Sequence, residues 1–358
     1  MSIFETIVLI INLIFCIPSL ASLTRFDQWW IRGFDFPRVQ ISILIILNIV
    51  LAAFAYPFDE TWHFIIVGVL VLSLFYQLYL IYPYTTLAKK QVIDYSGNSN
   101  GNTLAILVSN VLMTNRDYPK LIDLIKDKNP DLFLTLESDT GWEQALDTLE
   151  DEYKHTVKVP LDNLYGMHLY SKLPLEDIEV RYLVKDDIPS IHGYVKLGNG
   201  YRAKIHCLHP RPPSPTESKT STSRDAEILM IGNDMEEDPK LTLVFGDLND
   251  VAWSRTTKIF QRVSGLMDPR RGRGFFNTFS TEYRLLRWPL DHVFHSNDFT
   301  LMAISRGRHI GSDHFPMYIK LNYSPEKEDE QEKLSVNEDE KEWAEEKVKK
   351  GEKNPERS

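Results

Sequence analysis

The sequence of 358 residues contains few cysteines, no excess of positive charge and no internal repeat. Its two cysteines, Cys16 and Cys207, lie in regions of different character, so the polar part of the chain cannot form an internal disulfide. This fits a reducing compartment. The net charge is −10, and the segment from 325 onward holds 13 acidic and 8 basic residues. Such an acidic chain excludes broad, sequence-independent DNA binding, which requires a basic surface.

Charge is almost absent from three long apolar segments at 3–23, 39–57 and 62–82. Each is long enough to cross a hydrocarbon core of ~30 Å at ~1.5 Å per residue. We therefore predict a membrane anchor at 1–90 with three transmembrane helices. The first segment has Glu5 and no basic residue before its apolar run, which disfavours a signal peptide. No segment contains a paired ionisable cluster, so transport is poorly supported and anchoring is favoured.

The distribution of basic residues predicts the orientation of the anchor. The loop at 58–61 contains no lysine or arginine, whereas the first loop and the segment after the third span contain Arg25, Arg32, Arg38, Lys89 and Lys90. The positive-inside rule places that basic side in the cytoplasm. We predict a multi-pass protein of the cell (inner) membrane whose long C-terminal part lies in the cytoplasm. The bilayer is the expected partner, and the sequence indicates no protein partner.

Beyond the anchor, a linker rich in Ser, Asn and Gly is expected at 91–102 and a folded domain at 103–324. In this domain short apolar runs, typical of buried strands, alternate with a few amphipathic helices. Many strands with few helices between them predict two sheets packed face to face with helices outside. The charged tail at 325–358 remains open between disorder and an exposed helix that starts with a capping box at 335–338. Strands are expected at 103–112, 131–138, 155–161, 166–171, 177–184, 190–197, 201–208, 241–246, 290–295, 299–304 and 315–323, and helices at 117–130, 140–151, 217–236 and 255–264.

The polar residues that could carry chemistry occur where predicted strands end. Rigid scaffolds present catalytic groups at strand ends and in the adjoining loops. Taken singly, each of these residues also fits an ordinary turn, since Asn, Asp and Ser are common turn formers. In chain order they are Asn110, Glu137, His206, His209, Asp247, Asn249, Asp291, His292, Asp313 and His314.

The order of these residues resembles the endonuclease/exonuclease/phosphatase (DNase I-like) superfamily of metal-dependent phosphoesterases, over about residues 103–323. Its sharpest motifs here are Gly-Asp-Leu-Asn at 246–249 and Ser-Asp-His at 312–314. The N-terminal spans, "WWIRGFDFPR" and "HPRPP" look like a bacterial membrane-anchored branch. The resemblance implies an α+β fold, a four-layer α/β sandwich of two packed mixed β-sheets flanked by helices, preceded by three transmembrane helices.

The resemblance implies a site for Mg²⁺, with Mn²⁺ as an alternative. Glu137 would be the principal ligand, since carboxylate oxygens suit a hard cation. Asp313 would complete the metal shell directly or through water, and Asn110 would lie beside the metal. Some branches carry an acidic residue two positions after this asparagine. Here that position is Leu112, which implies fewer protein ligands and more water.

For catalysis, the resemblance implies that Asp247 orients or deprotonates the attacking water and that Asn249 donates to a phosphoryl oxygen of the substrate. His314 would contact the phosphate or act as the base, with Asp291 fixing its tautomer. His209 would be a phosphate contact or general acid. It is preferred over His206, which we interpret as a strand residue.

Basic residues near the Asp291 motif are candidates for substrate binding. The loop "DPRRGRGFF" at 268–276 is interpreted either as a phosphate-contacting segment or as a solvated loop. The candidates are Arg270, Arg271 and Arg287.

The leading interpretation is a membrane-anchored, divalent-metal-dependent phosphoesterase that hydrolyses a phosphodiester or phosphomonoester by metal-assisted attack of water. The substrate would be lipid-linked, small and soluble, or nucleic acid. One alternative is a membrane-tethered endonuclease or exonuclease acting on DNA or RNA, and another is a catalytically silent membrane scaffold. Members of the superfamily share the hydrolytic centre and differ in the surrounding loops, so the motifs predict a reaction class and not a substrate.

Overall fold

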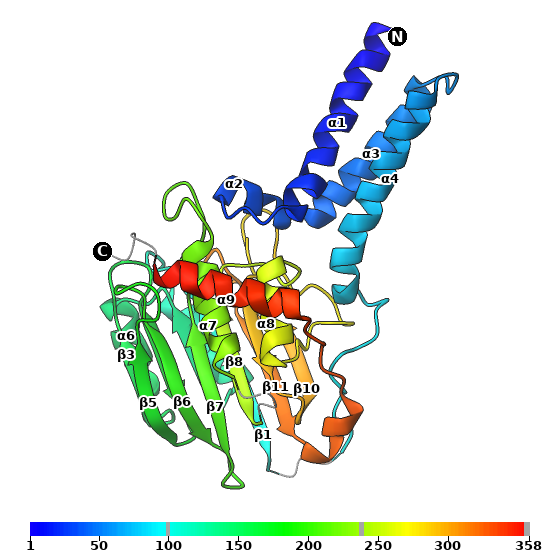
Figure 1. Ribbon diagram of the computed structural model, residues 1–358. Coiled ribbons are helices and arrows are strands. Elements are labelled where there is room, and N and C mark those ends of the chain that lie inside the picture. The colour runs from blue at the N-terminus through cyan, green and yellow to red at the C-terminus, as the bar shows by residue number, and fades with distance from the viewer. Residues whose placement is uncertain (98–100, 236–239, 354–358) are drawn as a thin grey trace.

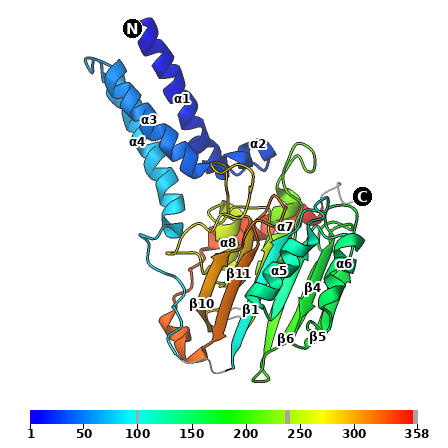
Figure 2. The ribbon, with the colours of Figure 1, turned by 180° about the vertical axis from the view of Figure 1, so that it is seen from behind.

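The computed structural model describes residues 1–97, 101–235 and 240–353. Three of its helices are long and apolar enough to cross a membrane: α1 (Ile3–Leu23), α3 (Arg38–Ala55) and α4 (Thr61–Ile81). The end of α1, the start of α3 and the end of α4 all lie toward the rest of the chain (Figures 1 and 2). Between α1 and α3 the chain forms the short helices α2 (Trp29–Arg32) and η1 (Gly33–Asp35).

Eleven strands of the described residues form two mixed sheets, and every strand expected from the sequence is present. One sheet has the order β10 (Phe299–Arg306), β11 (Met317–Tyr323), β1 (Thr103–Asn110), β2 (Leu132–Leu136), β4 (Met167–Ser171) and β3 (His155–Val159). The other has the order β5 (Leu175–Arg181), β6 (Ser190–Lys196), β7 (Arg202–Leu208), β8 (Thr242–Asp247) and β9 (Asp291–His295).

The two sheets pack face to face because alternate residues of their strands are apolar and point inward. Ile106 and Leu134 of the first sheet share one buried core with Ile205 and Phe245 of the second. The helices α5 (Tyr118–Lys128) and α6 (Thr140–Leu146) cover the outer face of the first sheet, and α7 (Thr222–Asn233) and α8 (Arg255–Ser264) that of the second (Figures 1 and 2). This confirms the expected four-layer sandwich.

The charged C-terminal segment, for which disorder and an exposed helix were both open, contains the 3₁₀ helix η4 (Pro325–Glu330) and the helix α9 (Glu338–Glu352). The capping box of α9 lies two residues later than expected: the Asn337 side chain accepts from the Glu340 N–H at 2.9 Å, and the Glu340 carboxylate accepts from the Asn337 N–H. Trp343 and Ala344 are buried in the cluster that α7 and α8 also form. One face of α9 is therefore buried. Residues 354–358 lie outside the described residues.

The first part of the expected linker at 91–102 lies along β10. Val92 is buried, the Tyr95 N–H donates to the Leu301 carbonyl at 2.8 Å, and the Leu301 N–H donates to the Ile93 carbonyl at 2.9 Å. These bonds attach this stretch to the sheet, in contrast to the flexible spacer expected from its composition. Residues 98–100 of the expected linker lie outside the described residues.

Candidate active site

Strand directions bring the polar motifs to one edge of the sandwich. The pairs β1–β2 and β7–β8 are parallel, so the C-terminal ends within each pair lie side by side. The strands β11 and β9 run antiparallel to β1 and β8, so their N-terminal ends lie at the same edge. Asn110, Asp247 and Asp291 are the terminal residues of β1, β8 and β9 at this edge, and Glu137, His209 and His314 lie in the loops next to it.

Asn110 connects two carboxylates that are far apart in sequence. Its side-chain N–H₂ donates to Glu137 Oε1 at 2.7 Å and to Asp247 Oδ2 at 3.2 Å. Its side-chain oxygen accepts from the Leu112 N–H at 3.1 Å. The amide nitrogen, which cannot ligate a cation, therefore faces the carboxylates, and the oxygen is already bonded. Asn110 therefore hydrogen-bonds both carboxylates, including Glu137, the expected metal ligand, and its place beside the metal stays a prediction.

His314 lies between two carboxylates. Its Nδ1 is 2.8 Å from Asp291 Oδ2, and its Nε2 is 3.5 Å from Asp247 Oδ2. Burial would lower the pKa of His314, but Asp291 and Asp247 outweigh it and raise the pKa to about 10. Burial would raise the pKa of Asp247, and the charge of His314 lowers it instead. Burial together with Asp247 raises the pKa of Asp291. The imidazole is thus held as a cation within the cluster.

His209 and Asn249 complete the edge from the second sheet. The Asn249 N–H donates to Asp247 Oδ1 at 2.9 Å, and its side-chain amide donates to the Pro210 carbonyl at 3.0 Å. Burial lowers the pKa of His209 to about 4, so this imidazole is neutral at physiological pH. The neutral ring of His209 has one buried nitrogen, Nδ1, without a hydrogen-bond partner among the described residues. His206 lies on β7, where its Nδ1 contacts His192 Nδ1 at 2.7 Å, and is a strand residue as expected.

The carboxylates of this edge fit a divalent cation. Burial raises the pKa of Glu137 to about 7, and Asp313 and Asp247 add to the rise. Such crowding of negative charge is relieved when a cation binds. Buried Asp291 Oδ1 has no hydrogen-bond partner among the described residues. Ligand atoms of Asp247, Asp291 and His314 lie within 4.8 Å of one another, a spacing that could also hold an ion. However, His314 Nδ1 is already bonded to Asp291, which favours the side of Glu137 and Asp313.

Backbone conformations at the edge are unusual. Leu112, Glu137 and Asn249 have φ of 58°, 56° and 51°, in the left-handed region that residues with a side chain seldom occupy. Leu112 and Asn249 lie two residues after the strand ends Asn110 and Asp247, and Glu137 directly follows the end of β2. Left-handed non-glycine residues cost free energy and are found where the surrounding structure holds them for function. The strain therefore supports these three loops as parts of one site.

A cleft of about 280 Å³ opens over this edge. Its polar lining includes Glu137, His209, Asn249, Asp313 and His314. The carboxylate of Glu217, which accepts from the Tyr165 hydroxyl, also lines the cleft. Apolar and aromatic side chains complete the lining, and they include Leu164, Tyr165, Pro212, Pro213, Phe279 and, from the segment between α1 and α3, Phe36.

Phe36 belongs to the segment between α1 and α3 and is held against the sandwich. Its ring packs edge-on against Trp288, with centroids 5.8 Å apart. The preceding residue, Asp35, accepts a hydrogen bond from Trp253 Nε1 at 2.7 Å through its carbonyl. Gln40 donates to the Leu285 carbonyl at 2.6 Å. The segment between α1 and α3 thus contributes to the wall of the cleft.

The sequence matches the model of the Endonuclease/Exonuclease/phosphatase family over residues 72–314. The chain belongs to this family. Its members hydrolyse phosphodiester bonds. No curated protein sequence matches the chain. The match includes all of the motifs at the sandwich edge described above.

Solved structures show the same fold at low sequence identity. D. rerio TDP2, in a complex with a single-strand DNA product, is 16% identical, with a TM-score of 0.51, over 62% of this chain and 99% of the other. A family member from Beutenbergia cavernae is 16% identical, with a TM-score of 0.51, over 62% and 72% of the two chains. The human Nocturnin catalytic domain is 13% identical, with a TM-score of 0.51, over 68% and 99%. These likenesses support the DNase I-like fold of the family.

The three arginines expected to bind substrate do not line the cleft. Arg270 is fully buried, where it pairs with Asp268 at 2.7 Å and contacts His292 Nδ1 at 2.6 Å. A guanidinium enclosed in this way supports β9 from behind and is inaccessible to substrate. Arg271 lies over the Tyr84 ring, away from the cleft. Arg287 donates to the Ser280 carbonyl at 2.9 Å within its own loop.

Three residues that support the site, Ser312, Thr278 and Phe36, were not among the candidates predicted from the sequence. Ser312 donates to the Asn110 carbonyl at 2.8 Å and accepts from the His314 N–H at 3.0 Å, so it links β1 to the histidine loop. Thr278 Oγ1 accepts from the Asp291 N–H at 3.2 Å. The serine is part of the Ser-Asp-His motif, which was the available signal. Phe36 lies within the motif "WWIRGFDFPR", which was its available signal, whereas Thr278 has no local pattern that separates it from an ordinary loop residue.

Proposed function

We propose that the chain is a membrane-anchored phosphoesterase that uses a divalent cation to hydrolyse a lipid-linked or small soluble phosphoester. The observation that carries this proposal is the gathering of carboxylates, imidazoles and carboxamides from separate strand ends around one cleft. Phosphoester hydrolysis requires that charge on the phosphoryl oxygens be neutralised, that water be positioned and that the leaving oxygen be stabilised. The groups of the cleft provide for each requirement.

We propose that Glu137 and Asp313 hold the cation, with Asp247 beside them. Hard oxygen ligands of this kind suit Mg²⁺, with Mn²⁺ as the alternative. When bound, the cation supplies Lewis-acid neutralisation of phosphoryl charge. Asn110 keeps the Glu137 and Asp247 carboxylates oriented through the two hydrogen bonds that its amide donates.

The remaining groups act on water and on the phosphoryl oxygens. Asp247, flanked by the Asn249 N–H and by His314, is placed to orient a water molecule and accept its proton. His314, held as an imidazolium by Asp291, is placed to donate to a phosphoryl oxygen. His209 is neutral with a free ring nitrogen and serves as a phosphate contact or proton donor.

The lining of the cleft favours a lipid-linked or small substrate over a long nucleic acid. Among the described residues that line the cleft, none is lysine or arginine. A polynucleotide backbone is normally held by several such cations. The apolar wall that contains Phe36, Phe279 and Leu164 suits an apolar group next to the phosphorus. Because Phe36 belongs to the anchor, this wall lies on the side of the cleft nearest to the bilayer.

Membrane attachment and orientation are part of the same proposal. The three apolar helices are proposed to span the cell membrane and the sandwich to lie in the cytoplasm, on the side of Arg25 and Lys89. A reporter enzyme fused after residue 358 and active only in the cytoplasm tests this. Activity of a periplasmic reporter at the same position would contradict it.

The test of the function uses the full-length protein in detergent with bis(p-nitrophenyl) phosphate, p-nitrophenyl phosphate and a short-chain phospholipid. Hydrolysis is expected only with Mg²⁺ or Mn²⁺ and is expected to be abolished by a chelator. Glu137→Gln and His314→Ala are expected to lower kcat/KM by at least about 100-fold. The matched controls are Asp123→Asn, at an exposed position of α5, and His155→Gln on β3. Both are expected to keep full activity. Equal activity in all four variants would contradict the proposed site.

Two other outcomes would redirect the proposal. Preferential cleavage of plasmid or single-stranded DNA would identify a membrane-tethered nuclease. Failure to bind Mg²⁺ or Mn²⁺ by calorimetry, together with no hydrolysis of any substrate in the panel, would identify a silent scaffold.

A further inference from the structure

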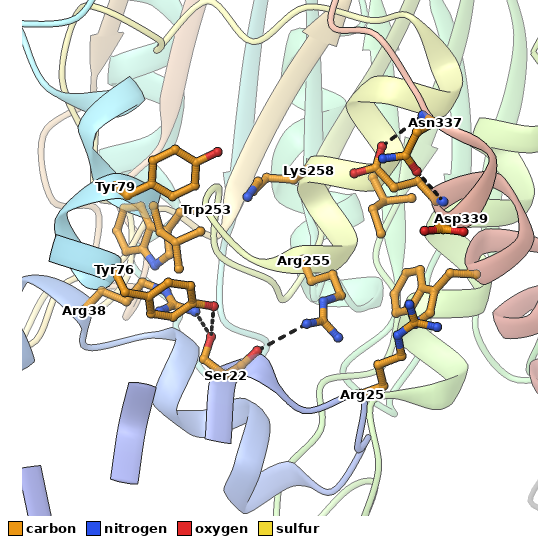
Figure 3. A pocket seen from close by; sticks show the side chains of 14 residues that line it. Ser22, Arg25, Arg38, Tyr76, Tyr79, Trp253, Arg255, Lys258, Asn337 and Asp339 are labelled. Atoms are coloured by element: carbon orange, nitrogen blue, oxygen red, sulfur yellow. Dashed lines mark hydrogen bonds between the residues drawn. The ribbon is translucent and has the colours of Figure 1, made fainter. Parts of the chain in front are cut away.

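A second pocket lies where the anchor meets the sandwich, and we refer to it as the junction pocket (Figure 3). It has a volume of about 280 Å³ and contains none of the residues that line the catalytic cleft. The anchor contributes Ser22 near the end of α1 and Tyr76 and Tyr79 near the end of α4. The sandwich contributes Arg255 and Lys258 of α8.

Basic side chains from both parts of the chain face the junction pocket. Lys258 extends from α8 toward α4, with its Nζ 5.8 Å from the centroid of the Tyr79 ring (Figure 3). Arg255 lies beside it and donates to the Thr24 and Leu23 carbonyls at 3.0 Å and 3.1 Å. Arg25, an exposed residue just after α1, lines the same pocket. Three cationic groups therefore meet in one pocket.

Two carboxylates, Asp339 and Glu340, line the pocket with these cations. Glu340 is ion-paired with Arg262 and Asp339 is exposed, so the cations are in excess. Arg38, also in the lining, is paired with Asp35. In the part of the chain that the structure describes, no ion pair involves Arg25, Lys258 or Arg255.

The environment of Lys258 is consistent with an excess of positive charge. Burial lowers the pKa of Lys258 to about 8, and Arg262, Arg38 and Arg271 contribute to the decrease. A half-buried ammonium among other cations is stabilised when an anion enters. The pocket thus offers an anion both charge and hydrogen-bond donors.

The position of the pocket relative to the expected membrane indicates where that anion comes from. Ser22 belongs to the last turn of α1, and Tyr79 lies within the last turn of α4, so the pocket is at the end of the bundle that faces the sandwich. Tyrosines at the ends of membrane spans lie at the level of the lipid headgroups. Lysine and arginine at this level attract the phosphates of anionic lipids.

We propose that the junction pocket binds the phosphate group of a membrane phospholipid, with Arg25, Lys258 and Arg255 as its donors. This site is separate from the cleft of the proposed active site, and the lipid binds there without being hydrolysed. A bound lipid would occupy the space between α4 and α8 and would strengthen the attachment of the anchor to the sandwich.

The experiment measures binding to the full-length protein in dodecyl maltoside, without turnover. Dioleoylphosphatidylglycerol is expected to raise the Tm by about 3 °C or more and to remain bound in native mass spectrometry. Dioleoylglycerol, which has the same acyl chains and no phosphate, is expected to produce neither effect. Inorganic phosphate is expected to produce a smaller shift than the phospholipid.

Variants connect the shift to the junction pocket. Arg25→Gln/Lys258→Gln is expected to lose at least half of the Tm shift and the retained lipid. Arg25→Gln alone, which changes an exposed side chain and leaves the core intact, is expected to show a partial loss. The control is Lys126→Gln, at an exposed position of α5, which should behave as the parent protein. Equal lipid shifts in all three variants, or a shift with dioleoylglycerol as large as with the phospholipid, would overturn the proposal. If inorganic phosphate raised the Tm as much as the phospholipid does, the claim that the bound anion comes from a lipid would be overturned.

Discussion

Among the individual side chains, the pair of His314 and Asp291 yields a prediction about pH. The two neighbouring carboxylates raise the pKa of His314 to about 10, so its protonated form persists below that pH and is lost as pH rises through it. Asp291→Asn removes one of these carboxylates and so lowers the pKa of His314. We expect kcat/KM to fall by about 100-fold and the alkaline limb of its pH profile to move to lower pH. Asp123→Asn is the control, and an unmoved alkaline limb would contradict the role of Asp291.

Glu137 leads to a prediction about cation affinity. Its pKa is raised to about 7, first by burial and then by Asp313 and Asp247. Because a cation binds the ionised carboxylate, protonation competes with binding as pH falls below about 7. We expect the affinity for Mg²⁺, measured by calorimetry, to be about tenfold weaker at pH 6 than at pH 8.

Glu137→Gln is expected to weaken the binding of Mg²⁺ at pH 8 by at least about tenfold and to remove most of the pH dependence. Asp123→Asn should leave both unchanged. The same affinity at pH 6 and pH 8 in the parent protein would show that Glu137 does not hold the ion.

Side chains differed in how well the sequence predicted their environment. Asp247 and Asn249 form a short motif at a strand end, so their place at the sandwich edge could be predicted from local pattern. Arg270 is in a loop with two other arginines and a glycine, a composition typical of a solvated loop. Its full burial depends on the pair with Asp268 and the contact with His292, which are formed only when β9 and the loop meet. Such pairing leaves no local signal.

At the level of strands, the close packing of β7 and β8 explains why a glycine, Gly246, precedes Asp247. Its φ is 145°, and a Cβ at this position would lie 2.0 Å from the Leu208 carbonyl of the neighbouring β7. Any side chain would force β7 and β8 apart immediately beside Asp247. We expect Gly246→Ala to lower the free energy of unfolding by about 2 kcal/mol or more and to abolish activity.

The control for Gly246→Ala is Gly33→Ala, where a Cβ would meet nothing within 4 Å. Thermal unfolding of both variants in detergent checks the prediction. A Tm of Gly246→Ala equal to that of the parent protein would mean that β7 and β8 can separate at no cost.

The segment between α1 and α3 provides a second prediction at this level. Phe36 lines the apolar wall of the cleft, so Phe36→Ala removes a contact available only to substrates with an apolar group. We expect KM for a long-chain phospholipid to rise about tenfold with kcat unchanged, and KM for bis(p-nitrophenyl) phosphate to change little. Phe26→Ala, an exposed position in the same segment, is the control. Equal effects of Phe36→Ala on both substrates would argue against the wall as a lipid contact.

Strands and helices were predictable to different degrees. The strands could be located because runs of apolar residues are bounded by Gly, Pro, Asn or Asp, and all eleven are present. The helix α8 begins at Arg255 and ends at Ser264, as expected from its apolar spacing. The burial of α9 could not be predicted, because its sequence is mostly charged and its buried face combines Trp343 and Ala344 with Lys347 and Gly351. The position of Phe36 in the cleft depends on how the segment between α1 and α3 packs against the sandwich, and this packing could not be predicted from local sequence.

Considered as one folded unit, the protein is expected to be sensitive to acid. Burial lowers the pKa of His168 to about 4 and those of His206 and His292 to about 3, so these rings are neutral in the folded state at pH 5. In the unfolded chain they take up protons below about pH 6.5. Their contribution to stability is therefore present above about pH 6.5 and is lost as pH falls toward 4. Burial lowers the pKa values of His192, His209 and His295 to about 4 in the same way. Burial also raises the pKa of Glu137 to about 7, of Glu227 to about 8 and of Asp250 to about 6, and these carboxyl groups oppose the trend.

Thermal unfolding of the detergent-solubilised chain checks this expectation. The Tm is predicted to decrease between pH 7 and pH 5, with each such histidine contributing up to about 1.4 kcal/mol per pH unit. His168, whose ring nitrogens have no hydrogen-bond partner among the described residues, is the most informative position. His168→Phe should reduce the decrease, and His155→Gln should not. A Tm that is constant over this range would contradict the prediction.

The proposed hydrolysis requires that Glu137 and Asp313 bind one divalent ion at the mouth of the cleft, with Asp247 beside them. The most direct measurement is an anomalous difference map from crystals of the full-length protein grown with Mn²⁺. We predict one strong peak between the Glu137 and Asp313 carboxylates in the parent protein and no peak there in Glu137→Gln. A Mn²⁺ peak elsewhere on the molecule, in crystals of a protein that hydrolyses phosphoesters, would contradict the proposed site.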